Sequence, residues 1–298
     1  MKSTWFDLLN INQPETPLPK GMDTAGAFAF LNSIRVEDAS EAEMQGYCKR
    51  DWRRFLHTWG LVKDLKGRCL ELGANPYFTT GLLREFTQLD IHLANYFGNP
   101  LTTAAQQNVQ LASRQSKTVT VVALDYSEFN VEGVVFPYPD HFFDVVVFCE
   151  IIEHLQFDPF SALKEIKRIL KPGGQLILTT PNVARLDNVF QIAAGKNIND
   201  RYSGYGPYGR HNREYTQAEI ESLLQLMGFA VEKGFTANVY FNHPLTFLRS
   251  FLVQLFTSVL FPWRRRDLGQ YIFVRARNDH SQHGPRPAWL FRSFSPGD

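Results

Sequence analysis

The sequence is poor in cysteine and carries almost no net charge. Its 298 residues contain three cysteines, Cys48, Cys69 and Cys149. Their odd number and lack of paired spacing exclude a disulfide framework and a paired zinc motif, so we interpret them as buried small side chains. Thirty-one Lys and Arg balance 30 Asp and Glu. That balance argues against nucleic acid as a partner, because such partners require a broad basic face.

Other signatures are also missing. There is no Gly-x-x-x-x-Gly-Lys-Ser/Thr loop of nucleoside triphosphatases and no Gly-x-Ser-x-Gly elbow of serine hydrolases. The N-terminal residues MKSTWFD lack the apolar core of a signal peptide. We therefore expect a cytoplasmic protein. Hydrophobic residues make up 44% of the chain, enough to bury a large core.

One long apolar stretch is present. Residues 244–263 read PLTFLRSFLVQLFTSVLFPW, and three arginines follow at 264–266. A membrane-spanning helix needs about 20 predominantly apolar residues, but Arg249 and Gln254 interrupt this one. Three interpretations stay open: a buried or interface helix, a helix lying on the inner membrane face with a basic flank, and, as the weakest, a spanning helix.

Most of the remaining chain alternates between strand-like and helix-like segments. Apolar runs predict strands at 68–72, 91–95, 118–124, 144–149 and 175–180, and helices are expected at 79–88, 102–113, 159–170 and 216–227. Such alternation is typical of a parallel sheet covered by helices. Two later strand-like segments, 230–241 and 269–277, are expected to pair antiparallel at an edge. The fold class predicted is α/β: a Rossmann-like, mostly parallel sheet with helices on both faces and an antiparallel edge strand.

The same patterns suggest three parts. Residues 1–60 form an N-terminal arm, irregular to residue 37, and a helix at 38–59. Residues 61–278 form the main domain with an apolar helical insert at 244–266. Residues 279–298 form a flexible tail rich in glycine and proline.

The segments that carry chemistry follow the predicted strands. CLELGANP at 69–76 places Glu71 and Gly73 after the first strand, where an open parallel sheet binds ligands. FPYPD at 136–140 precedes FDVVVFCE at 143–150, and IIEHL follows at 151–155. ILKPGG at 169–174 then leads into the fifth strand.

This series resembles the class I S-adenosylmethionine-dependent methyltransferases with a type 11/12-like domain, over residues 68–241. The resemblance implies S-adenosylmethionine as cofactor. It places residues of the first motif at the amino-acid part of the cofactor, Asn95 at the ribose, Asp125 or Asn130 at the adenine edge and Phe129 or Val131 against its face. Glu150 would lie beneath the sulfonium. The first-motif residues are Glu71, Gly73, Ala74 and Asn75.

Two positions depart from the family pattern. Only Gly73 remains of the usual glycine-rich loop, and Asn95 stands where the family has an acid. An amide can still form hydrogen bonds but carries no charge.

The predicted catalytic residues are Glu150, Glu153 and His154. Their i, i+3, i+4 spacing puts them on one face if the turn is helical, and together with His211 they could bind a divalent ion. The arrangement resembles metal-assisted O-methyltransferases, including those of quinone biosynthesis and of small-RNA 3′ ends. Two alternatives stay open: Glu153 and His154 tie down the loop after the fourth strand, or His154 acts as a base without metal.

A tyrosine- and arginine-rich segment at 202–216 is the candidate acceptor site. A solvated connector ending in a helix cap at Thr216 is the alternative. The candidate acceptor residues are Tyr205, Tyr208, Arg210, His211, Arg213 and Tyr215.

The sequence therefore predicts methyl transfer from S-adenosylmethionine, in the first place to oxygen. The expected acceptor is a glycan, a glycolipid or lipid-linked intermediate, or a small metabolite, and peripheral membrane contact would run through 244–266. The alternative is a catalytically degenerate binding or scaffold protein with the same fold.

Overall fold

The computed structural model describes residues 14–98, 102–112, 119–157, 159–199, 209–240 and 267–279, with the isolated positions 255–256, 259–261, 264, 284–285 and 290. The tyrosines at 205 and 208 and most of the apolar stretch lie outside these residues. Within the described part, no helix is both long and apolar enough to cross a membrane.

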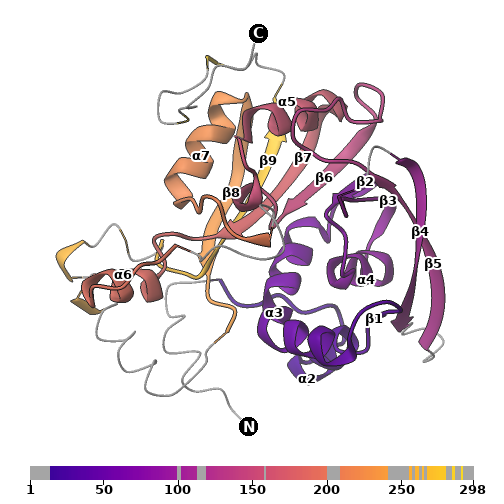
Figure 1. Cartoon of the computed structure of the whole chain (residues 1–298), viewed down its shortest axis with the longest axis horizontal. Helices are drawn as coiled ribbons and strands as arrows, with labels where there is room; N and C mark the ends of the chain where they lie inside the picture. The colour runs from indigo at the N-terminus through magenta and orange to yellow at the C-terminus, as the bar shows by residue number, and fades with distance from the viewer. Residues whose placement is uncertain are drawn as a thin grey trace.

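A nine-stranded sheet in the order β1-β4-β5-β3-β2-β6-β7-β9-β8 forms the centre of the molecule (Figure 1). The strands β5, β3, β2, β6 and β7 are parallel to their neighbours within this group, whereas β9 runs antiparallel to both β7 and β8. The predicted mostly parallel sheet and the pairing of the last two strands are thus confirmed. The strands are β1 Arg35–Val36, β2 Lys66–Leu72, β3 Gln88–Asn95, β4 Thr102–Ala112, β5 Val119–Glu128, β6 Phe143–Cys149, β7 Leu170–Pro181, β8 Phe229–Ala237 and β9 Tyr271–Asn278.

Helices cover both faces of this sheet, as predicted. The helices α2 (Thr24–Leu31), α3 (Glu41–Val62) and α4 (Phe78–Phe86) pack on one face, and α5 (Pro159–Ile169) and α7 (Gln217–Leu226) pack on the other. The short helix α6 (Leu186–Ala193) projects away from both layers.

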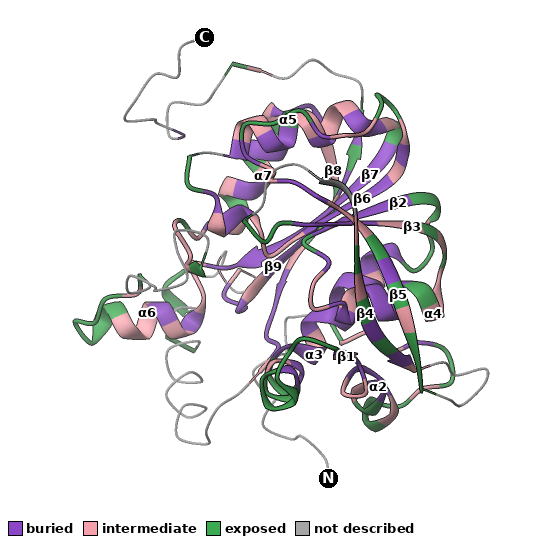
Figure 2. Ribbon diagram, turned by 45° about the vertical axis from the view of Figure 1, so that its right-hand side comes forward, coloured by how far each residue is buried: buried purple, intermediate pink, exposed green. Residues whose placement is uncertain are grey.

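The central strands read as continuous apolar runs because both of their faces are buried. In β6, Val145 and Val147 enter the core beneath α3 and α4, whereas Val146 and Phe148 enter the core beneath α5 and α7. Figure 2 shows this buried centre and the more exposed ribbon of β4 and β5.

The prediction of a helix at 102–113 is wrong. Residues 102–112 form β4, which pairs antiparallel with β5 from Ala105 opposite Tyr126 to Ala112 opposite Val119. Val109 and Leu111 are buried, whereas the alternating polar residues face solvent. Pairing with β5 and this two-residue periodicity override the helix propensity of the alanines and glutamines.

The segment before residue 37 is more regular than expected. It contains α2, whose N-cap Asp23 accepts a hydrogen bond from Gly26 N–H, and the short strand β1. The predicted helix at 38–59 corresponds to α3, and its apolar face belongs to the same core as β2 and β3. In the tail, Gly284 N–H donates to the Leu226 carbonyl and Leu290 is buried. The boundaries between the three predicted parts stay a prediction.

Candidate active site

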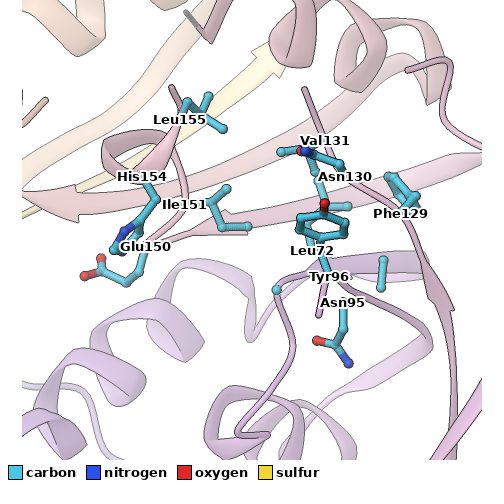
Figure 3. A pocket seen from close by; sticks show the side chains of 12 residues that line it. Leu72, Asn95, Tyr96, Phe129, Asn130, Val131, Glu150, Ile151, His154 and Leu155 are labelled. Carbon is cyan, nitrogen blue, oxygen red and sulfur yellow. The ribbon is translucent and has the colours of Figure 1, made fainter. Parts of the chain in front are cut away.

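A cavity opens at the carboxyl ends of β2, β3, β5 and β6 (Figure 3). The chain after β2 continues to β3 on one side, while β6 pairs with β2 on its other side. Such a switch point leaves a crevice between diverging connections, where open α/β sheets bind ligands. The lining residues are Leu72, Gly73, Ala94, Asn95, Tyr96, Phe129, Asn130, Val131, Glu150, Ile151, His154 and Leu155.

Glu71 and the loop that follows it form a second cavity beside the first. Gly73 borders both cavities, together with Glu150 and Leu72. Gly73 has φ +67°, and a Cβ there would lie 2.9 Å from Ile151 Cδ1, so glycine is needed at this turn. Glu71 is buried and accepts a hydrogen bond from Thr80 Oγ1 at 2.7 Å. Burial raises the pKa of Glu71 to about 8. The four first-motif residues thus gather at this second cavity.

Arg54, on α3, is a site residue that the sequence analysis missed. It lines the second cavity, is 5% exposed, and contacts Glu150 Oε2 through Nη1 at 3.4 Å. Its Nη2 donates to the Tyr47 hydroxyl, and its Nε lies 3.5 Å from Asp51 Oδ1 in a buried ion pair that is not a hydrogen bond in the described structure. Arg54 thus places a buried positive charge, shared with Glu150 and Asp51, at the wall of the second cavity. The signal in the sequence was a charged residue on the apolar face of a predicted helix.

Glu150 connects the two cavities. It has a left-handed φ of +55°, and its carboxylate accepts a hydrogen bond from Thr179 Oγ1 at 2.8 Å while facing Arg54. Burial raises the pKa of Glu150, and the positive charge of Arg54 opposes that rise. Glu150 lines the first cavity together with His154, but it is not part of the cluster of candidate metal ligands that contains Glu153 and His154, because only 152–154 form the helical turn and the Glu150 carboxylate faces Arg54 on α3.

Two other predicted cofactor residues lie differently from the expectation. Asp125 lines neither cavity: it is exposed on β5 and accepts a hydrogen bond from Gln106 Nε2. Its position three residues before the end of β5 puts it on the solvent face of the ribbon. The other adenine candidate, Asn130, does line the first cavity with Phe129 and Val131. Asn95 also borders that cavity, but its amide points away from the other lining side chains (Figure 3).

Glu153, His154 and His211 form a cluster whose candidate ligand atoms lie within 4.8 Å of one another. Glu153 is completely buried, and its Oε1 has no hydrogen-bond partner in the described structure. The Nε2 atom of His154 lies 3.9 Å from that oxygen. Burial, with the nearby charge of Glu150, raises the pKa of Glu153 to about 8.

Both histidine rings of the cluster are oriented by their other nitrogen. His154 Nδ1 lies 2.9 Å from the Arg210 carbonyl oxygen, and His211 Nδ1 lies 2.8 Å from Glu214 Oε1. A carbonyl can only accept, so Nδ1 of His154 carries the proton and Nε2 has a lone pair. A carboxylate or carbonyl behind a histidine is the arrangement that orients metal ligands.

The turn at 152–154 also ties down the chain that precedes α7. The Glu153 carbonyl accepts hydrogen bonds from the N–H groups of Asn212 and Arg213, and Asn212 Nδ2 donates to the His154 carbonyl. The backbone carbonyls of Glu153 and His154 therefore tie down this part of the chain, which is the alternative role that the sequence analysis left open. Their side chains remain available for the cluster.

The candidate acceptor residues are divided. His211 and Arg213 line a third cavity with Asn212, Glu214, Asn199, Val183 and Ile198. Arg210 supplies the carbonyl that orients His154. Tyr215 is 2% exposed and belongs to the core, because it packs beneath α7 and precedes the capping box of Thr216. Tyr215 is therefore a packing residue.

The fold and the cavities together define an α/β protein that holds a cofactor at the switch point of its sheet. A family model described as a methyltransferase domain matches residues 43–233. The chain belongs to this family and contains a class I S-adenosylmethionine-dependent methyltransferase domain.

Individual relatives match over shorter segments. The chain is 32% identical over 127 residues to a Mycolicibacterium smegmatis protein that carries the name of an S-adenosylmethionine-dependent methyltransferase, covering 38% of this chain and 44% of that protein. It is 34% identical over 93 residues to the mitochondrial ubiquinone biosynthesis O-methyltransferase of Rattus norvegicus, covering 30% and 25%. The match thus spans less than half the length of either relative.

A solved structure with a related fold is that of Haemonchus contortus phosphoethanolamine N-methyltransferase 2 in complex with S-adenosyl-L-methionine. Its TM-score is 0.44 at 13% identity, covering 88% of this chain and 61% of that chain.

Proposed function

We propose that this methyltransferase transfers the methyl group to an oxygen atom and that Glu153, His154 and His211 hold a divalent cation beside the cofactor. The observation that carries the proposal is the buried Glu153 Oε1, which lacks a hydrogen-bond partner in the described structure and faces His154 Nε2. A buried carboxylate oxygen without a partner is costly. Two oriented imidazoles and one carboxylate form a donor set that suits a first-row divalent metal.

The acceptor chemistry explains why a cation is useful. As the C–O bond forms, the C–S bond of the sulfonium breaks and the electron pair stays on sulfur, which leaves S-adenosylhomocysteine. The acceptor hydroxyl must release its proton to solvent in this step, and this is difficult because its pKa lies far above neutral. When bound, the cation would act as a Lewis acid that lowers the pKa of the acceptor hydroxyl. His154 borders the cofactor cavity and His211 borders the third cavity. The cluster therefore lies between the space for the cofactor and the space we assign to the acceptor.

The chain itself supplies binding and orientation. We assign Glu71, Gly73 and Ala74 to the amino-acid end of the cofactor, in the cavity that Arg54 also lines. Phe129, Asn130 and Val131 would contact the adenine. Alignment of acceptor and methyl group by these contacts supplies much of the rate enhancement.

The third cavity favours a polar acceptor, in keeping with a glycan or glycolipid. Its lining includes amide, guanidinium and carboxylate side chains from Asn199, Asn212, Arg213 and Glu214. Such groups suit the hydroxyls of a sugar better than an apolar metabolite.

We further propose peripheral membrane contact through residues 244–266, which would suit the lipid-linked form of that acceptor. The described apolar residues of this segment are exposed, and they are Leu255, Phe256, Val259, Leu260 and Phe261. Arg264, at the start of the basic triplet, donates to the Ala184 carbonyl and pairs with Asp267, which fixes the end of the segment beside α6. Sedimentation with anionic vesicles tests this contact: deletion of 244–266 should abolish binding, and unchanged binding would reject it.

The metal site is tested by cation content and cofactor binding in parallel. We expect the wild type to take up about one Mn²⁺ per chain, measured by calorimetry and elemental analysis, and to bind S-adenosylmethionine. Glu153→Gln and His154→Ala should lose the cation but keep the cofactor. His92→Ala, which removes an imidazole outside the cluster, should lose neither. Unchanged cation content in both cluster variants would reject the site. Methyl transfer that continues in the presence of a chelator would show that the reaction does not require the cation.

A further inference from the structure

A polar network joins β4 to the loop that borders the cofactor cavities. Gln107, on the inner side of β4, accepts two hydrogen bonds at the same oxygen: its Oε1 lies 3.1 Å from Asn75 Nδ2 and 2.8 Å from the Tyr77 hydroxyl. The Tyr77 hydroxyl in turn accepts from Asn95 Nδ2 at 3.0 Å, and Asn95 Oδ1 accepts from Asn75 N–H at 2.8 Å. The network thus closes a ring of four side chains around the loop.

The loop needs such a hold because its backbone is unusual. Tyr77 has a left-handed φ of +67° and is completely buried, a conformation that costs free energy for a residue other than glycine. The N–H groups of Gly73 and Ala74 both donate to the Ala94 carbonyl at the end of β3. The loop is therefore fixed by β3 through its backbone and by β4 through Gln107.

Asn95 takes part in this network through both polar atoms of its amide. Both atoms of its amide are hydrogen-bonded to loop residues, it is 4% exposed, and the amide is directed away from the cavity (Figure 3). The position that the family resemblance gives to a ribose ligand therefore performs a different task in this chain.

We propose that Gln107 is a positioning residue for the cofactor loop, acting through Asn75 and Tyr77, and that Asn95 holds this same loop instead of the cofactor's ribose. β4 stands where the sequence predicts a helix, and its two-residue periodicity is what turns Gln107 inward while Gln106 and Gln110 face solvent. The inference rests on cofactor binding alone and is independent of the metal cluster.

Two glutamines of one strand provide a matched test. Gln107→Leu removes the shared acceptor, whereas Gln110→Leu makes the same change on the exposed face. Titration calorimetry with S-adenosylmethionine should give a Kd about tenfold higher for Gln107→Leu, equivalent to about 1.4 kcal/mol, with unchanged stoichiometry. Gln110→Leu should match the wild type. Gln107→Glu keeps an oxygen that accepts both hydrogen bonds and should restore the Kd to within about twofold of wild type.

The outcomes separate positioning from folding. A lower stoichiometry with an unchanged Kd would mean that Gln107 only stabilises the fold, and a wild-type Kd in Gln107→Leu would overturn the proposal outright. If the leucine variant does not fold, Tyr77→Phe removes only the hydroxyl at the centre of the network and should raise the Kd in the same way.

Asn95→Asp tests the second half of the proposal. A carboxylate cannot donate to the Tyr77 hydroxyl, so we expect this variant to bind the cofactor several-fold more weakly. If Asn95 instead faced the ribose hydroxyls, the added carboxylate would accept hydrogen bonds from them and the Kd would fall. Tighter binding by Asn95→Asp would therefore refute the assignment.

Discussion

The buried carboxyl of Glu71 makes the stability of this protein depend on pH in a specific way. Burial raises its pKa to about 8 in the folded state, compared with 4.5 for an ordinary glutamate. Between these two values the unfolded chain has released the proton and the folded chain retains it. The free energy of unfolding therefore falls as pH rises, because the folded state binds more protons. The contribution is complete below the unfolded pKa and is lost as pH rises to about 8.

The magnitude follows from the two pKa values. Proton linkage gives a decrease in the free energy of unfolding of about 3–4 kcal/mol between about pH 5 and pH 8 from this one group. Glu71→Gln keeps an oxygen that accepts the hydrogen bond of Thr80 but cannot ionise. The stability of the variant relative to the wild type should thus increase by about 3–4 kcal/mol over the same pH range.

Urea unfolding of both proteins at a series of pH values, followed by tryptophan fluorescence, measures this difference directly. The comparison with the variant is essential because burial also raises the pKa of Glu153 to about 8. Both carboxyls therefore contribute to the pH dependence of the wild-type free energy of unfolding. If the two curves stayed parallel from acid to neutral pH, Glu71 would be ionised in the folded protein, and the reasoning from burial would be wrong.

Three further predictions follow from the site and its supports. Below the pKa of Glu153, cation binding must displace the proton of this carboxyl. The affinity for Mn²⁺ should therefore increase about tenfold for each unit by which the pH is raised toward neutrality, and calorimetry that finds no pH dependence would contradict this. Gly73→Ala should lower the free energy of unfolding by about 1–3 kcal/mol and weaken cofactor binding, because residue 73 has φ +67° and its Cβ would meet Ile151. Thermal unfolding measures this loss, and Gly46→Ala, where nothing lies within 4 Å of the added Cβ, is the control. Thr216→Ala should lower the free energy of unfolding by about 1 kcal/mol, since it breaks the capping box of α7; an unchanged urea midpoint would show that the cap contributes nothing.

The parts of the fold that could be predicted are those whose sequence pattern and burial agree. β6 reads Phe-Asp-Val-Val-Val-Phe-Cys, and its side chains enter the two cores alternately, so the apolar run itself indicates a central strand. β4 has no such run. Its alternation is confined to Val109 and Leu111 among alanines and glutamines, and only pairing with β5 makes it a strand.

The site shows the same division. Gly73 and Glu150 were predictable because they follow strands whose carboxyl ends meet at one edge of the sheet. Arg54 was not, because it reaches Glu150 from α3, an element that the motif does not include. His211 was expected beside His154 as a possible further ligand of a divalent ion, and the structure brings the two together in one cluster. Their role as metal ligands stays a prediction.

The contacts of β4 explain both departures from the family pattern, the loop that keeps only Gly73 and the amide of Asn95 in place of an acid. Read along the chain, a loop with one glycine and an amide in place of the ribose acid look like separate losses of cofactor binding. In the structure, Asn95 donates to Tyr77 and accepts from Asn75, and Gln107 holds both of those residues. The loop keeps Gly73 alone, and at Tyr77 it adopts a left-handed φ of +67° that costs free energy for a residue other than glycine, so side-chain partners are needed to hold it. The acid at the end of β3 could not supply the donor that Tyr77 receives from Asn95, so an amide there and an inward glutamine on β4 require each other.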